Sequence, residues 1–130
     1  MRSTTLILPP LAVLALIAPR TLHADPSRTV EIEIVDTPKA GASHLSHFAV
    51  SVALDRGWFA TDTQDGAASL HLGARIDHQP SGELLTIEVR RHGVGDFDVQ
   101  AARTLAQPAR TLMGKVERDA GRSEVFVTVK

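Results

Sequence analysis

Cysteine is missing from all 130 residues of the chain. The fold therefore has no disulfide bond, and no thiol is present for nucleophilic catalysis or for a lipid anchor on an N-terminal cysteine. A chain of this length can bury enough apolar surface to fold without such crosslinks. We expect one domain held together by its hydrophobic core and its hydrogen bonds.

The chain also has no large excess of positive or negative charge. The chain has 14 Lys and Arg against 15 Asp and Glu, with a formal net charge of −1. The two signs are interspersed, whereas a nucleic-acid footprint or a membrane-surface segment needs clustered positive charge. We expect no nucleic-acid partner.

No hydrophobic run is long enough to cross a bilayer. The longest, Leu6–Ala18, falls short of the roughly 20 residues that a spanning helix needs. Met1–Arg2 precedes it with positive charge, and Pro19–Ala24 follows as a short polar stretch ending in a small residue. This layout predicts a signal peptide over residues 1–24, with an uncleaved membrane anchor as the competing interpretation. We expect a periplasmic or secreted protein with one domain over residues 25–130 and no transmembrane segment after cleavage.

The segment Glu83–Arg91 has the clearest periodicity in the chain. Apolar and polar residues alternate one by one through it, which predicts a strand with one face in a core and one in water. Turn-forming residues flank it at Pro80–Gly82 and His92–Gly95. We expect it to be the central strand of the fold.

Similar segments recur at intervals of about ten residues, which predicts an all-β fold. The architecture expected is a small antiparallel β-sandwich or barrel of seven to eight strands. Leu45–Leu54 and Asp96–Thr104 are strand candidates for which a helix is the competing interpretation. Asp62–Gly66 has the composition of a turn. Gly114 is a candidate β-bulge. The remaining strand candidates are Thr29–Asp36, Gly57–Thr61, Ala67–Asp77, Arg110–Val116 and Arg122–Lys130.

Enzymatic motifs are not found. The chain has no G-x-S-x-G nucleophile elbow, and the G-x-G at Gly93–Gly95 has neither a third glycine nor a following helix. We therefore expect a non-enzymatic protein without a cofactor.

Three histidines are the candidate metal ligands: His44, His47 and His71. His44 and His47 form the one close pair, but their spacing puts them on opposite faces of a strand. His47 and His71 each lie on the polar face of a predicted strand, so they are able to meet across a sheet. The competing interpretation is that all three are surface residues, because metal sites usually need a further ligand and supporting partners.

Trp58, Arg90 and Arg91 are the candidate binding residues. Because the chain has no tyrosine, an aromatic platform would rest on Trp58 and its neighbour Phe59, and core packing is the competing interpretation. Arg90, Arg91 and His92 form a local basic cluster that would suit an acidic partner. A solvated strand end is the ordinary alternative.

Taken together, these features predict an exported binding or interaction module of the bacterial envelope. The expected partner is an envelope protein that pairs with an open edge strand, because a two-sheet fold leaves such edges unpaired. The alternative is a periplasmic metal-binding module that uses its surface histidines.

Overall fold

The computed structural model describes residues 26–105 and 109–130, and these contain eight strands. The predicted all-β class is confirmed. No helix in the described part of the chain is long and apolar enough to cross a membrane. The predicted signal peptide lies outside the described residues. The strands are β1 (Ser27–Pro38), β2 (His44–Ala53), β3 (Phe59–Asp65), β4 (Ala68–Gln79), β5 (Gly82–His92), β6 (Phe97–Leu105), β7 (Thr111–Arg118) and β8 (Gly121–Val129).

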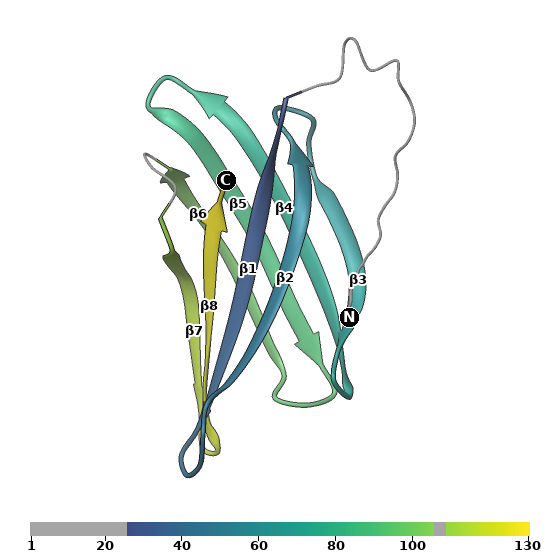
Figure 1. Ribbon diagram of the computed structural model, residues 1–130, viewed down its shortest axis with the longest axis vertical. Coiled ribbons are helices and arrows are strands. Elements are labelled where there is room, and N and C mark those ends of the chain that lie inside the picture. The colour runs from purple at the N-terminus through teal and green to yellow at the C-terminus, as the bar shows by residue number, and fades with distance from the viewer. Residues whose placement is uncertain (1–25, 106–108) are drawn as a thin grey trace.

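The strands form two four-stranded antiparallel sheets that stack against each other (Figure 1). The first sheet has the order β2-β1-β8-β7, and the second has the order β3-β4-β5-β6. The chain changes sheets after β2 and again after β6, whereas its other connections join strands that are paired. The predicted central strand is β5, which lies inside the second sheet between β4 and β6.

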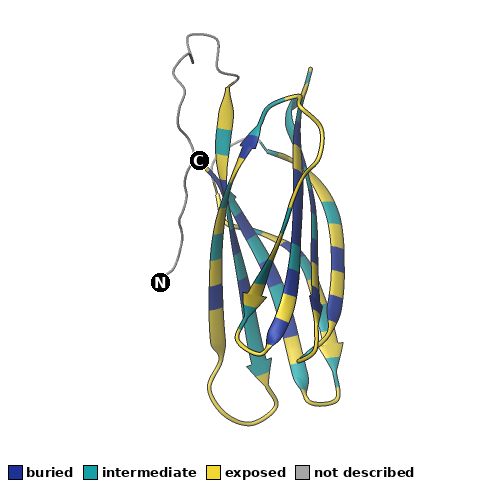
Figure 2. Cartoon of the chain, turned by 90° about the vertical axis from the view of Figure 1, so that its right-hand side faces the viewer, coloured by how far each residue is buried: buried dark blue, intermediate teal, exposed yellow. Residues whose placement is uncertain are grey.

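The core lies between the two sheets and is built by the period-2 alternation of the strands. Every second residue is buried, so buried and exposed bands alternate along the strands (Figure 2). On β1, Val30, Ile32 and Ile34 are fully buried. Leu85, Ile87 and Val89 of β5 are equally buried and belong to the same core cluster. Each such side chain contributes about 1.5–3 kcal/mol by leaving water.

Gly114 marks the side of the fold where β6 of the second sheet approaches β7 of the first. The pairing of β7 with β8 shifts register between Leu112 and Gly114, which confirms the predicted bulge. The Val99 side chain of β6 occupies the space that a Cβ on Gly114 would need. Absence of a side chain at Gly114 therefore allows the two sheets to pack closely on this side.

The strand interpretation of Leu45–Leu54 and Asp96–Thr104 is confirmed over the helix alternative, because these segments form β2 and β6. One prediction of local structure needs correction. Asp62–Gly66 is not a turn over its whole length. β3 continues to Asp65, and only residues 66–67 turn, with Gly66 at a φ of 63°. A two-residue hairpin needs positive φ, and glycine supplies it without steric strain.

Candidate functional site

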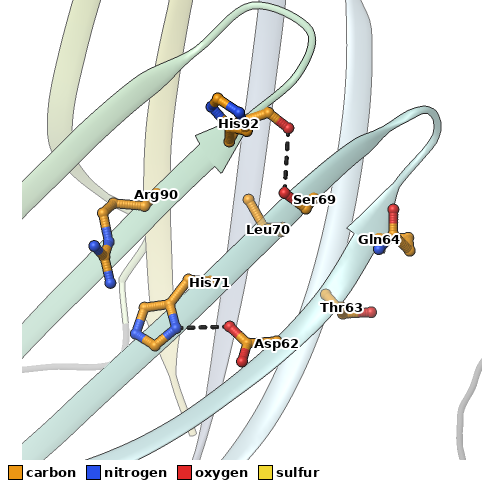
Figure 3. A pocket seen from close by; sticks show the side chains of 8 residues that line it. All are labelled: Asp62, Thr63, Gln64, Ser69, Leu70, His71, Arg90 and His92. Carbon is orange, nitrogen blue, oxygen red and sulfur yellow. Dashed lines mark hydrogen bonds and ion pairs between the residues drawn. The ribbon is translucent and has the colours of Figure 1, made fainter.

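A surface depression lies on the outer face of the second sheet, across β3, β4 and β5 (Figure 3). Its volume is about 610 Å³. Most of its lining side chains occupy the outward positions of these strands, opposite to the core residues. The lining residues are Asp62, Thr63, Gln64, Ser69, Leu70, His71, Arg90 and His92.

Strand register places Asp62, His71 and Arg90 side by side on this face. Asp62 of β3 pairs with His71 of β4, and His71 in turn pairs with Arg90 of β5. His71 Nδ1 lies 2.8 Å from Asp62 Oδ1, and the two side chains point toward each other in Figure 3. Asp62 is mostly exposed, so one carboxylate oxygen orients the imidazole while the carboxylate keeps further acceptor capacity in contact with water.

Glu88 of β5 extends this polar arrangement across the sheet. Its Oε2 accepts a hydrogen bond from Gln100 Nε2 of β6 at 3.2 Å and lies 3.3 Å from Arg90 Nε. Its Oε1 lies 3.8 Å from His71 Nε2. These contacts link all four strands of the second sheet. We call this set, which consists of Asp62, His71, Glu88, Arg90 and Gln100, the outer polar row.

Trp58 lies directly against the same face. Gly73 of β4 points outward like His71, yet it is buried, because a Cβ on it would lie 2.5 Å from Trp58 Cζ2. Gly73 pairs with Glu88, so the indole covers a position next to the outer polar row. Trp58 is itself 45% exposed, and Phe59 is 37% exposed. The core-packing interpretation of these two aromatic residues is therefore wrong.

A second polar cluster lies between the sheets, at the end that carries the β1–β2, β3–β4, β5–β6 and β7–β8 turns (bottom of Figure 1), which we call the hairpin end. Arg91 is its centre and is only 7% exposed. Arg91 donates to Asp36 of β1 at 2.7 and 2.8 Å and to Asp65 of β3 at 3.2 Å. It also donates to Ser123 of β8 and to the carbonyl of Gly95. One guanidinium thus ties both sheets together.

Two serines complete this inner polar cluster, which we define as Asp36, Ser46, Asp65, Arg91, Arg118 and Ser123. Ser46 of β2 donates to Asp65 at 2.7 Å, which adds a further link between the sheets. Ser123 donates to Asp36 at 2.5 Å and accepts a bond from Arg118 Nη2 at 2.6 Å. Arg118 Nη1 is buried without a hydrogen-bond partner among the described residues.

Contacts within the inner polar cluster shift the pKa values of Asp36 and Arg91. Burial raises the pKa of Asp36, and hydrogen bonds from Arg91 and Ser123 lower it. The charges of Arg91 and Arg118 add to this lowering, so the pKa of Asp36 lies below its ordinary value. The hydrogen bond to Asp36 raises the pKa of Arg91 against the opposing effect of burial.

The three predicted metal ligands lie in three different places. His44 pairs with Asp36 and lines a cavity of about 550 Å³ at the hairpin end. His47 lies on the outer face of the first sheet, 3.8 Å from Glu31, and His71 lies on the outer face of the second. Within residues 26–105 and 109–130, no group of three or more His, Cys, Asp or Glu is placed to hold a metal ion. The structure therefore does not bring the three histidines together.

The predicted binding residues are also divided between two faces. Trp58 and Arg90 share the outer face of the second sheet. Arg91 points inward, and its donors are occupied by the inner polar cluster. A solvated strand end is thus the wrong interpretation for Arg91.

The free edge of β2 is a further candidate contact surface. β2 pairs with β1 on one side and with no described strand on the other. Its ten residues include no Asp, Glu, Lys, Arg or Pro, and its register with β1 is uninterrupted. Leu45, near its start, is 56% exposed. Charges, prolines and bulges are the usual means by which edge strands avoid pairing with other chains, and β2 has none of them.

No protein-family model, curated protein or solved structure matches this chain. Any function must therefore be argued from its own residues.

Proposed function

We propose that this protein is an exported, non-enzymatic β-sandwich module of the bacterial envelope that binds an extended segment of a partner protein along β2. The observation that carries the proposal is the uncharged and regular free edge of β2. An extended segment that pairs with such an edge gains main-chain hydrogen bonds along its length. The export step rests on the signal-peptide pattern of residues 1–24.

The other three edge strands support the choice of β2 by contrast. β3 carries Asp62 and Asp65, and β6 carries Asp98 and Arg103. β7 has charged residues and is bent by its bulge at Gly114. Such features disfavour pairing with another strand. We therefore expect a partner segment to pair with β2 rather than with β3, β6 or β7.

The side chains of β2 indicate the chemistry of the partner. The residues that point away from the core, among them His47, Ala49 and Ser51, are small or uncharged and exposed. A partner segment that alternates small or apolar residues with polar ones would match this surface without burying an unpaired charge. Main-chain hydrogen bonds would supply affinity, and these side chains would supply selectivity.

Site-specific photo-crosslinking in the exporting host tests this proposal. A photoreactive residue at Ala49 on β2 should give a defined adduct with one envelope protein. The same residue at Ala102 on β6, the matched control edge, should not. The partner identified in this way should then protect β2 amides from hydrogen exchange when it is mixed with the purified protein.

Two results would overturn the proposal. The first is equal crosslinking from both positions, or crosslinking from neither. The second is a catalytic activity of the purified protein that one side-chain substitution removes. The intact mass of the exported protein tests the export step separately, since cleavage after Ala24 leaves a chain that begins at Asp25.

A further inference from the structure

We propose that Trp58 and the outer polar row form a binding site for a neutral oligosaccharide chain. This site lies on the outer face of the second sheet, whereas β2 is an edge of the first. The inference does not depend on the β2 proposal.

Trp58 is the first observation behind this inference. Its indole is held against the backbone at Gly73, and it stays 45% exposed. A large apolar ring that is fixed in place but open to water forms a platform, because little conformational entropy is lost when a ligand packs on it. Sugar rings carry C–H groups on their faces and can pack on such a platform.

The outer polar row supplies the second requirement, which is hydrogen bonding to the hydroxyl groups around a sugar ring. Asp62 and Glu88 are acceptors, whereas Arg90 and Gln100 are donors, and all of them lie on one face. A hydroxyl group both donates and accepts, so a mixed set suits it better than a set of one kind. Figure 3 shows Asp62, His71 and Arg90 grouped on this face.

Size and position agree with a ligand of this class. The depression of about 610 Å³ is within the usual range of small-molecule sites, roughly 300–1,000 Å³. Gly73 is two residues from His71 on the same strand face, so the indole lies roughly 7 Å along the strand from the histidine position. A chain of linked sugars can therefore cover the platform and the depression together.

Charge argues against an anionic ligand. Four carboxylates lie on the strands of this face, Asp62, Asp77, Glu88 and Asp98, against two arginines, Arg75 and Arg90. An acidic sugar or a phosphate would meet more negative than positive charge. A protein partner is disfavoured as well, since the centre of such an interface needs several apolar side chains. On this outer face, Trp58 is the one exposed large apolar side chain among the described residues.

The chain carries its own reporter for the test. Trp58 is the sole tryptophan and there is no tyrosine, so intrinsic fluorescence reports on this residue alone. Cellohexaose, chitohexaose and maltohexaose would be titrated to millimolar concentration, with emission and heat of binding recorded. We expect a saturable emission change and heat with at least one of them.

Variants locate the binding. Glu88→Gln should weaken it, and Gly73→Ala, whose Cβ displaces the indole without removing it, should weaken it roughly tenfold. Trp58→Ala, followed by calorimetry, should abolish measurable heat, and Trp58→Phe should restore part of it. Leu112→Ala removes an equally exposed apolar side chain from β7 of the first sheet and should leave affinity unchanged. Ala49→Lys on β2 should also leave the affinity unchanged.

Three results would overturn the inference. One is the absence of fluorescence change and heat with all three hexasaccharides. Another is affinity that survives in Trp58→Ala, Gly73→Ala and Glu88→Gln proteins that remain folded. The last is tighter binding of hexagalacturonate, an acidic oligosaccharide, than of the neutral chains, because the carboxylates on this face disfavour it.

Discussion

The inner polar cluster and the outer polar row are built from similar side chains in opposite surroundings. Arg90 and Arg91 show the contrast best, because they are consecutive residues of β5. Arg91 is 7% exposed and hydrogen bonds to groups from both sheets. Arg90 lies on the outer face, with its side chain half exposed, and contacts Glu88 of its own strand. One step along a strand thus separates an arginine that holds the sheets together from one that is accessible to a ligand.

This difference follows from the cost of burying charge. A buried guanidinium must be fully hydrogen bonded, and all three nitrogens of Arg91 have partners. Exposed groups such as Asp62 do not need a full set of hydrogen bonds within the protein, because water forms the remaining ones. We therefore expect substitutions in the inner polar cluster to change stability, and those in the outer polar row to change binding.

Arg91→Met should produce the largest loss of stability. Methionine keeps much of the side-chain volume but leaves the partly buried Asp36 and Asp65 without their ion-pair partner. Removal of one partner of a buried ion pair costs about 3–5 kcal/mol in the free energy of unfolding. Urea unfolding, followed by Trp58 fluorescence, measures this change.

Arg90→Met is the matched control, because it makes the same substitution one residue away. Its side chain is exposed, so the free energy of unfolding should change by less than about 0.5 kcal/mol. Equal losses in the two variants would contradict the division between inner and outer positions.

Ser123→Ala should have the next largest effect. Ser123 is 1% exposed and contacts Asp36, Arg91 and Arg118. Alanine leaves these groups short of a partner inside the fold, which costs about 1–3 kcal/mol. Ser69→Ala on the outer face of β4 is the control and should stay within about 0.5 kcal/mol of the wild type. An unfolding midpoint for Ser123→Ala that equals that of Ser69→Ala would show that the inner hydroxyl is dispensable.

Acid should weaken the inner polar cluster through Asp36. Its pKa is lowered in the folded protein, so its contribution to stability is present above the ordinary aspartate pKa of 3.8. That contribution is lost as the pH falls from there through the lowered value, because over this range the unfolded chain binds a proton at Asp36 more readily than the folded protein does. Asp36→Asn cannot take up this proton, so its free energy of unfolding should fall less steeply with acid. Parallel pH profiles of the two proteins would refute this role for Asp36.

Much of the inner polar cluster could be predicted from the alternation in the sequence. Asp36 follows Val30, Ile32 and Ile34 at steps of two, and Arg91 follows Leu85, Ile87 and Val89 in the same way. Ser123 similarly precedes the buried valines of β8. These polar residues occupy inward positions at the ends of apolar sets, where a mutual network is the physical means of burying them. The basic-cluster interpretation of Arg91 overlooked this continuity.

The outer polar row depends instead on strand register, which alternation alone does not fix. The pairing of Asp62 with His71 follows from a two-residue turn at residues 66–67. A turn spread over Asp62–Gly66 takes Asp62 out of the strand and removes that pairing. The position of Trp58 over Gly73 was still less predictable, because it depends on how the segment between the sheets passes across β4.

Glu88→Gln should have a small effect on stability. Its partners on the outer face are His71, Arg90 and Gln100, and the glutamine keeps the shape of the side chain. Loss of such surface ion pairs costs about 0–1 kcal/mol. Glu33→Gln is the control, because Glu33 forms a comparable contact with Arg110 on the first sheet. Urea unfolding should give similar values for both variants. A loss for Glu88→Gln as large as that for Arg91→Met would mean that the outer polar row also holds the fold together.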